Sequence, residues 1–206
     1  MTELFISAFV TFFVVIDPPG CVPIFASLTG GTDATHRRRM AVKSVLVGAA
    51  ILFVFAAVGE AFLAALGISL EAFRIAGGIM LFLIALDMVF EGRTERREAR
   101  AEEVRAREPE DVSVFPMGIP MIAGPGSIAS AMLLTARSNG AAESAVVFAA
   151  LAAILLLTLV ALLVAGPLMR WMGAGLEAMI TRVLGVILAA LAAQFVVDGL
   201  KASFAV

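Results

Sequence analysis

The sequence predicts an all-α polytopic membrane protein whose six transmembrane helices form two inverted three-helix repeats, with the first and fourth helices broken. Apolar residues make up 61% of the 206 residues and charged residues 16%, against about 45–50% and about 25% in soluble domains. The apolar residues gather in stretches long enough to cross a bilayer, which takes roughly 20 residues. Similar Pro/Gly motifs interrupt two of these stretches, about half the chain apart.

Polar connections separate the apolar stretches, and we expect every stretch to be helical because a chain in lipid must satisfy its backbone hydrogen bonds internally. The predicted spans are 4–28, 42–66, 72–90, 114–136, 145–168 and 179–200. The expected organisation is a first three-helix repeat over 1–90, a charged cytoplasmic linker over 91–113 and a second repeat over 114–206. Together they form one transmembrane domain.

The first span is interrupted by Asp17-Pro18-Pro19-Gly20, deep in the predicted bilayer. Adjacent prolines remove backbone donors and clash with the preceding turn, so this motif is expected to break the helix. Asp17 before Pro18 is typical of an N-cap with proline at the first helical position. Two alternatives remain open: a kink that serves packing alone, and an Asp17 that only caps its own half-helix.

Carboxylates also occur within the second and third spans. Glu60 and Asp87 lie a few residues from the span ends, where ionisation costs less than at the bilayer centre. With Asp17, they are the candidate carriers of a coupling proton or a sodium ion.

Two arginines and a glycine pair are candidates for packing or gating. Arg74 begins the third span and Arg182 the sixth, and the alternative for both is an anchor that reaches the membrane surface. Gly77-Gly78 is expected to form a close helix-packing surface rather than a substrate contact.

The connection after the third span is highly charged. Between Glu91 and Asp111 lie 14 of the 32 Asp, Glu, Lys and Arg residues of the chain. Good helix formers and a Glu103–Arg107 pair four residues apart predict a solvated helix or a tether. The alternative, docking of a partner or of lipid headgroups, is weakened by the mixed charge of the segment.

Lysine and arginine are distributed unevenly between the two sides of the predicted bilayer. If the N-terminus lies outside, 12 of these residues face the cytoplasm, and only Arg74, Arg137 and Lys201 lie on the other side. The positive-inside rule therefore predicts that both termini lie outside the cytoplasm.

The two halves of the chain share short motifs in the same order. Ile16-Asp17-Pro18-Pro19-Gly20 aligns with Ile122-Ala123-Gly124-Pro125-Gly126, and Arg74-Ile75-Ala76-Gly77 aligns with Arg182-Val183-Leu184-Gly185. These matches indicate a duplication of the kind that builds many transporters. Because three helices is an odd number, the second unit enters the membrane from the opposite side, and the repeat is inverted.

Each break creates a half-helix N-terminus whose free N–H groups attract anions. A zwitterionic amino acid suits such a pocket, with its carboxylate on these N–H groups and its ammonium near Asp17. The candidate substrate-binding residues are Asp17, Pro18, Pro19, Gly20, Cys21, Gly124, Pro125, Gly126 and Ser127.

Other classes of function are disfavoured. A net charge of −2 gives no electrostatic footprint for nucleic acid, and the single Cys21 cannot form an internal disulfide. The lone His36 excludes a histidine-rich metal site, and Ser127 has no histidine in any span to activate it as a nucleophile. We therefore expect no enzyme, no cofactor and no bound metal.

Three motifs together resemble the MarC family of bacterial and archaeal inner-membrane proteins. They are Asp17-Pro18-Pro19-Gly20 with Pro23-Ile24-Phe25, Arg74-Ile75-Ala76-Gly77-Gly78-Ile79 running to Asp87, and Phe115-Pro116 through Ile119-Pro120 to Gly124-Pro125-Gly126. The resemblance covers essentially the whole chain. It implies a multi-pass transporter of small neutral amino acids such as glycine and alanine. The alternative is a non-transporting membrane protein with an assembly or regulatory role.

Overall fold

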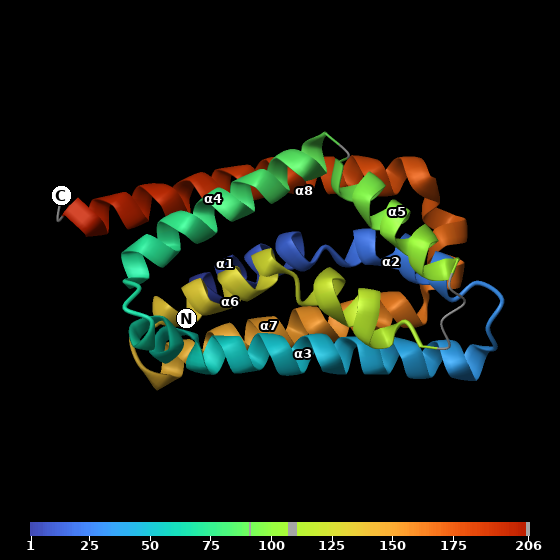
Figure 1. Ribbon diagram of the computed structural model, residues 1–206, viewed down its shortest axis with the longest axis horizontal. Coiled ribbons are helices and arrows are strands. Elements are labelled where there is room, and N and C mark those ends of the chain that lie inside the picture. The colour runs from blue at the N-terminus through green and yellow to red at the C-terminus, as the bar shows by residue number, and fades with distance from the viewer. Residues whose placement is uncertain (91, 107–110, 205–206) are drawn as a thin grey trace.

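The computed structural model describes residues 1–90, 92–106 and 111–204, and the side chains of 92–94, 170–174 and 177 are excepted (Figure 1). Arg107, the predicted partner of Glu103, lies outside the described residues. The elements are α1 (Thr2–Ile16), α2 (Pro18–Leu28), α3 (Ala34–Ala65), α4 (Leu70–Val89), α5 (Gly92–Arg105), the irregular helix η1 (Ser113–Ile122), α6 (Pro125–Ala136), α7 (Ala141–Leu163) and α8 (Ala165–Phe204).

Both predicted breaks are confirmed. Asp17 separates α1 from α2, and η1 meets α6 at a bend of 53°. Within the described part of the chain, five segments are long and apolar enough to cross a membrane, and the bent pair makes a sixth. An all-α polytopic membrane protein with broken first and fourth spans is therefore the observed fold.

The two halves of the chain run in opposite directions. α1 and α2 lead toward the end of the molecule that carries α5, whereas η1 and α6 lead away from it (Figure 1). α7 is antiparallel to α3 in the same way, and α8 to α4. The packing is reciprocal: α3 lies against η1 and α6, and α7 lies against α1 and α2. Each half thus buries the broken helix of the other.

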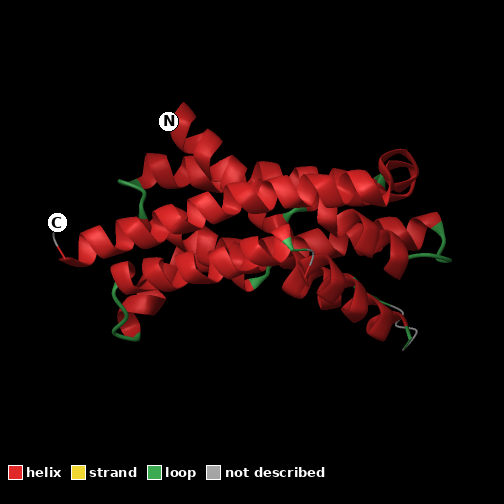
Figure 2. Ribbon diagram, turned by 90° about the horizontal axis from the view of Figure 1, so that it is seen from above, coloured by secondary structure: helices red, strands yellow, loops and turns green. Residues whose placement is uncertain are grey.

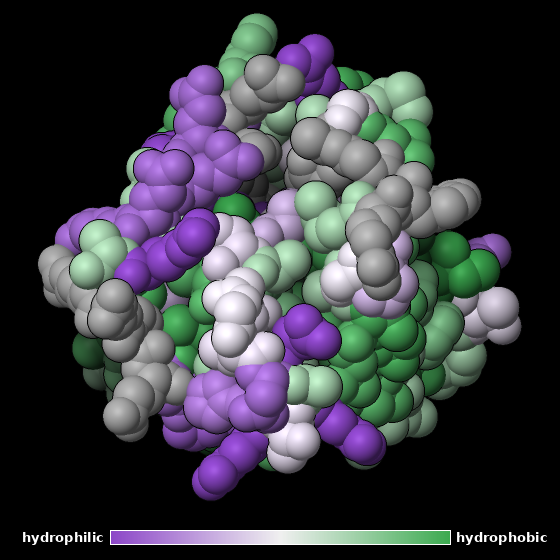
Figure 3. Space-filling view, turned by 90° about the vertical axis from the view of Figure 1, so that its right-hand side faces the viewer, coloured by the Kyte–Doolittle hydropathy of each residue, from purple (hydrophilic) through white to green (hydrophobic). Residues whose placement is uncertain are grey.

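The ends of the bundle differ in polarity. Both termini lie at the end away from α5 (Figures 1 and 2). Hydrophilic side chains gather at the α5 end (Figure 3). Between the ends, α3 exposes large apolar side chains along one face, among them Leu46, Val54, Val58 and Phe62. Such a stripe suits contact with lipid, because apolar side chains that face acyl chains do not pay the free-energy cost of exposure to water.

Several helices begin after an aspartate or serine whose side-chain oxygen accepts a hydrogen bond from a free backbone N–H, as expected of these residue types. Asp33 accepts a hydrogen bond from the His36 N–H at 2.8 Å and Ser69 accepts one from the Ala72 N–H at 3.1 Å. Before η1, Asp111 accepts the Ser113 N–H at 2.8 Å and pairs with Lys43 of α3.

The Lys43 ammonium and the hydrogen bonds from Ser113 lower the pKa of the Asp111 carboxyl to about 2, because they stabilise its charged form. At neutral pH this ion pair therefore joins Asp111, just before η1, to α3.

α4 and α8 approach closely because glycines line their contact. A Cβ at Gly78 would lie 2.9 Å from the Ala192 carbonyl oxygen, and one at Gly199 would lie 3.1 Å from the Glu71 carbonyl oxygen. Without a strong hydrophobic drive in lipid, small residues let helices gain van der Waals contact. The neighbouring Gly77 faces α6 instead, where a Cβ would lie 2.9 Å from a methyl group of Leu133.

The charge distribution generates a prediction about topology. Single cysteines placed in the exposed part of α5, such as Glu98→Cys, should react with a membrane-impermeant maleimide only from the cytoplasmic side. Cys21→Ser is a suitable background because Cys21 is buried and donates to the Ile16 carbonyl, which a serine hydroxyl can also do. The Thr2→Cys variant, at an exposed position, should react only from outside, and the reverse pattern would refute the orientation.

The glycine contacts generate a prediction about stability. Gly78→Ala should destabilise the protein by about 1–3 kcal/mol, the usual cost of overpacking, because its methyl group meets the α8 backbone. Gly166→Ala is the matched control, since a Cβ there meets nothing within 4 Å. Thermal unfolding in detergent would compare the two variants. Equal melting temperatures would show that the α4–α8 contact tolerates a wider separation.

Candidate functional site

Asp17 forms the first break. It is the one non-glycine residue with a positive φ, 57°, in the described part of the chain, a conformation that aspartate tolerates better than most residues. Its Oδ1 accepts a hydrogen bond from the Gly20 N–H at 3.1 Å, and Pro18 begins α2. The predicted N-cap is therefore confirmed. The carboxylate is also almost completely buried, with 1% of its side-chain surface exposed.

Gly20 permits this geometry. A Cβ at this position would overlap Oδ2 of Asp17 and would lie 2.9 Å from Nη1 of Arg97. Any side chain would thus displace the capping carboxylate or its cationic partner. The glycine of the motif is needed here for close approach, while its φ is an ordinary helical one.

Arg97 is the cationic partner of Asp17, and sequence analysis missed it. Its Nη1 lies 3.0 Å from Oδ2 of Asp17, and 12% of its side chain is exposed. The segment that carries it was expected to be solvated, but α5 packs on α2 and α4. A signal was present in the sequence: Arg97, Ala101 and Val104 recur on one helical face, and the two apolar residues are buried.

The second break has a different chemistry. Gly124 is the N-cap of α6 and, having no side chain, leaves the helix without a side-chain cap. A Cβ at Gly124 would lie 2.6 Å from the Pro120 carbonyl oxygen, so a larger residue does not fit. Pro125 has no N–H to satisfy, and the N–H groups of Gly126 and Ser127 fall in the first turn, where helices offer no backbone acceptor.

The two breaks adjoin each other. A Cβ at Gly126 would lie 3.2 Å from Cγ1 of Val15, which is two residues before Asp17. The same Cβ would lie 2.7 Å from Cδ1 of Ile84 in α4. The first turn of α6 is therefore packed between the end of α1 and the middle of α4.

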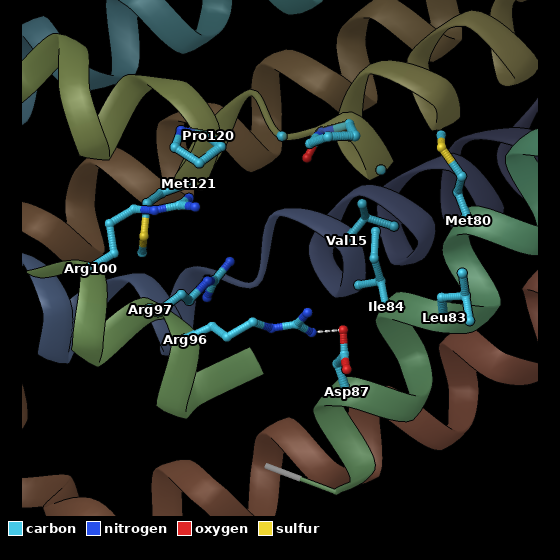
Figure 4. Close-up of a pocket in the computed structure, with 14 residues that line it drawn as sticks. Val15, Met80, Leu83, Ile84, Asp87, Arg96, Arg97, Arg100, Pro120 and Met121 are labelled. Atoms are coloured by element: carbon cyan, nitrogen blue, oxygen red, sulfur yellow. Dashed lines mark hydrogen bonds and ion pairs between the residues drawn. The ribbon is translucent and has the colours of Figure 1, made fainter. Parts of the chain in front are cut away.

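A cavity of about 400 Å³ opens beside this contact, within the range usual for small-molecule sites. Its walls come from α4, α5, η1, α6 and the end of α1 (Figure 4). The polar lining comprises Asp87, the first turn of α6 and three arginines of α5 whose side chains extend into the cavity. These arginines are Arg96, Arg97 and Arg100.

The structure separates the predicted site residues into two groups. Gly124, Pro125, Gly126 and Ser127 line the cavity, as does Asp87, which is paired with Arg96. The first-break residues are not part of the lining, and Arg97 lies between Asp17 and the cavity. Those first-break residues are Asp17, Pro18, Pro19, Gly20 and Cys21.

Glu60 and Arg182 lie away from the cavity. Glu60 is exposed on α3 and Arg182 is exposed on α8. Neither residue lines the cavity, so the structure does not bring Glu60 together with the other two candidate carboxylates.

A second polar cluster lies at the opposite end of α6. Arg137, which ends α6, pairs with Asp198 of α8, and its guanidinium carbon lies 4.8 Å from the centre of the Phe195 ring. Gln194 donates a hydrogen bond to the same aspartate at 2.6 Å. Arg74 has a buried Nε without a hydrogen-bond partner in the structure.

The charges of the cavity limit its chemistry. In the described residues, no group of three or more His, Cys, Asp or Glu side chains is placed to hold a metal ion. The cavity instead offers guanidinium groups and helix N–H donors, which suit a carboxylate. Beside it, behind Arg97, lies one buried carboxylate, which suits a cation.

Known proteins similar to this chain are membrane proteins. It is 38% identical over 199 residues to a UPF0056 membrane protein of Methanocaldococcus jannaschii, with 97% of each chain covered. It is 34% identical over 207 residues to UPF0056 membrane protein YvbG of Bacillus subtilis, covering 100% of this chain and 98% of the relative. With UPF0056 membrane protein YhcE of Escherichia coli the identity is 31% over 196 residues, covering 95% and 91%.

No solved structure matches this chain. The model of the MarC family of integral membrane proteins matches residues 2–204, nearly the whole chain. Of the motifs that carry the resemblance, those of α4 and of the second break line the cavity, whereas the first-break motif lies beside it, behind Arg97. The chain belongs to the MarC family of integral membrane proteins.

Proposed function

We propose that this chain is a secondary transporter of small neutral amino acids such as glycine and alanine in the cytoplasmic membrane. One observation carries the proposal: two half-helix N-termini of opposite chemistry lie close together, the α6 terminus in the cavity wall and the α2 terminus behind Arg97. The α2 terminus is capped by the Asp17 carboxylate, whereas the α6 terminus has no side-chain cap. A zwitterionic amino acid has a carboxylate that suits the α6 terminus and an ammonium group that suits the Asp17 carboxylate.

The carboxylate of the amino acid would bind at the first turn of α6. The N–H groups of Gly126 and Ser127 are oriented for anions, and the helix dipole adds to their attraction. The Ser127 hydroxyl is a further donor from a side chain that is nearly fully buried and lines the cavity. Arg100 extends into the same cavity and supplies positive charge (Figure 4).

The ammonium group would bind at Asp17. A carboxylate at this depth needs a cationic partner, because an unpaired buried charge is costly. Small residues around it, Gly20 and Cys21, leave room for a compact group rather than a long side chain. Asp87, at the cavity wall, is the second candidate for carrying a coupling proton or sodium ion.

Transport would proceed by alternating access between the inverted halves. The cavity is lined by α5, which lies at one end of the bundle, while the Arg137–Asp198 pair joins α6 to α8 at the other. Exchanging the conformations of the two halves would open the second end and close the first. Inverted repeats permit this because each half already packs on the broken helix of the other.

Uptake of radiolabelled glycine, alanine and serine into proteoliposomes tests the proposal. Asp17→Asn keeps the cap but removes the charge, so it should weaken substrate binding about 10- to 150-fold, the usual worth of a hydrogen bond to a charged group. Glu60→Gln is the control, because that carboxylate is exposed and away from the cavity. No uptake by the unaltered protein would favour the assembly or regulatory role instead.

The carboxylate end generates a separate prediction. Ser127→Ala should raise the KM for glycine about 2- to 10-fold, which corresponds to the loss of one hydrogen bond. Ser130→Ala is the matched control one turn further along α6, since the Ser130 hydroxyl is buried, has no hydrogen-bond partner among the described residues and does not line the cavity. If both variants transport like the unaltered protein, the carboxylate does not bind at the start of α6.

A further inference from the structure

We propose that α5 is an internal latch, in which the Arg97 guanidinium occupies the position that the substrate ammonium takes at Asp17. The substrate and α5 then compete for one carboxylate. The identity of the competitor rests on the proposed function, but the latch itself rests on contacts within this chain. The charged segment between the repeats would then control access to the carboxylate of the first break.

Arg97 closes the route from the cavity to Asp17. Arg97 lines the cavity and Asp17 does not, while the two side chains are 3.0 Å apart (Figure 4). A solute in the cavity therefore reaches Asp17 only after the guanidinium has moved. The ammonium of an amino acid is a positively charged hydrogen-bond donor, as the guanidinium is, and can satisfy the same oxygen.

Two ion pairs between described residues join α5 to the other helices, and the buried one matters more. Arg96 pairs with Asp87 of α4, but 66% of the arginine and 36% of the aspartate side chain are exposed. Exposed pairs contribute little, since solvent screens them. For Arg97 and Asp17 the exposed fractions are 12% and 1%, so separating them leaves a buried charge without a partner.

This cost couples the latch to the substrate. α5 cannot leave Asp17 without a replacement cation, and a bound ammonium removes that cost. The other contacts of α5 are weak: of its described residues only Ala101 and Val104 are buried. An element with so few buried apolar contacts belongs to the least stable part of a structure, from which moving parts are drawn.

The latch is tested by the accessibility of the buried face of α5 in the full-length protein. The Ala101→Cys variant, in the Cys21→Ser background, should react slowly with maleimide because Ala101 is 2% exposed. Adding Arg97→Met, which keeps an unbranched apolar stem but removes the guanidinium, should accelerate labelling several-fold. Adding Asp17→Asn should do the same, and the two changes together should give no further increase, because they break one interaction.

Matched variants on α5 exclude a general loosening of the helix. Arg105→Met removes an arginine at the end of α5 that does not line the cavity, and it should leave labelling slow. Arg97→Lys retains a cation and should restore slow labelling. The Glu102→Cys variant, at an exposed position, should react rapidly in every background. If Arg97→Met leaves the labelling of Ala101→Cys unchanged, the latch is refuted.

The competition with substrate is tested with glycine as the probe. Saturating glycine should accelerate labelling of the Ala101→Cys variant, and Arg97→Met should tighten glycine binding about 5- to 150-fold, the usual range of a coupling between sites. Glycine that is transported but does not change labelling would overturn the competition. If glycine is neither bound nor transported while Arg97→Met still opens α5, the proposed substrate fails and the latch stands.

Discussion

A broken helix within a bilayer exposes backbone N–H and C=O groups that only the protein itself can satisfy, and this constraint shapes the molecule. At the first break the chain turns through the left-handed conformation of Asp17, whose carboxylate caps the following half-helix. This solution places a charge deep in the molecule, so a second group must neutralise it. Arg97 does so from α5, 80 residues further along the chain.

At the second break, hydrogen bonds within η1 satisfy part of the backbone without a charge. In η1 the Met117 N–H donates to the Val112 carbonyl, and the Ala123 N–H to that of Gly118, each spanning five residues. These wide turns surround two residues with extended dihedral angles, Phe115 and Ile119. Because α6 then begins at a glycine, its first N–H groups have no side-chain cap. The backbones of the two halves thus follow similar paths, but a carboxylate caps the half-helix after the first break and no side chain caps the one after the second.

Reciprocal packing holds the breaks in place. Each broken helix lies against the second helix of the other half, and the third helices of the two halves pack along each other through glycines. α5 lies between the two halves and, in the part of the chain that the structure describes, has no counterpart within either of them. The pseudo-symmetric frame is therefore closed by one asymmetric element, which lies on the cavity side.

The sequence by itself determined the local features of this protein: the apolar spans, both breaks, the N-cap at Asp17 and the opposite directions of the halves. Hydropathy, proline and glycine act over a few residues, so their effects can be derived without knowing the fold. Only the tertiary structure decided that Arg97 meets Asp17, that Asp87 joins the second break and Glu60 does not, and which helices the apolar face of the charged segment packs on. Those outcomes depend on which helix faces come together, and residues far apart in the chain carry no local signal of that choice.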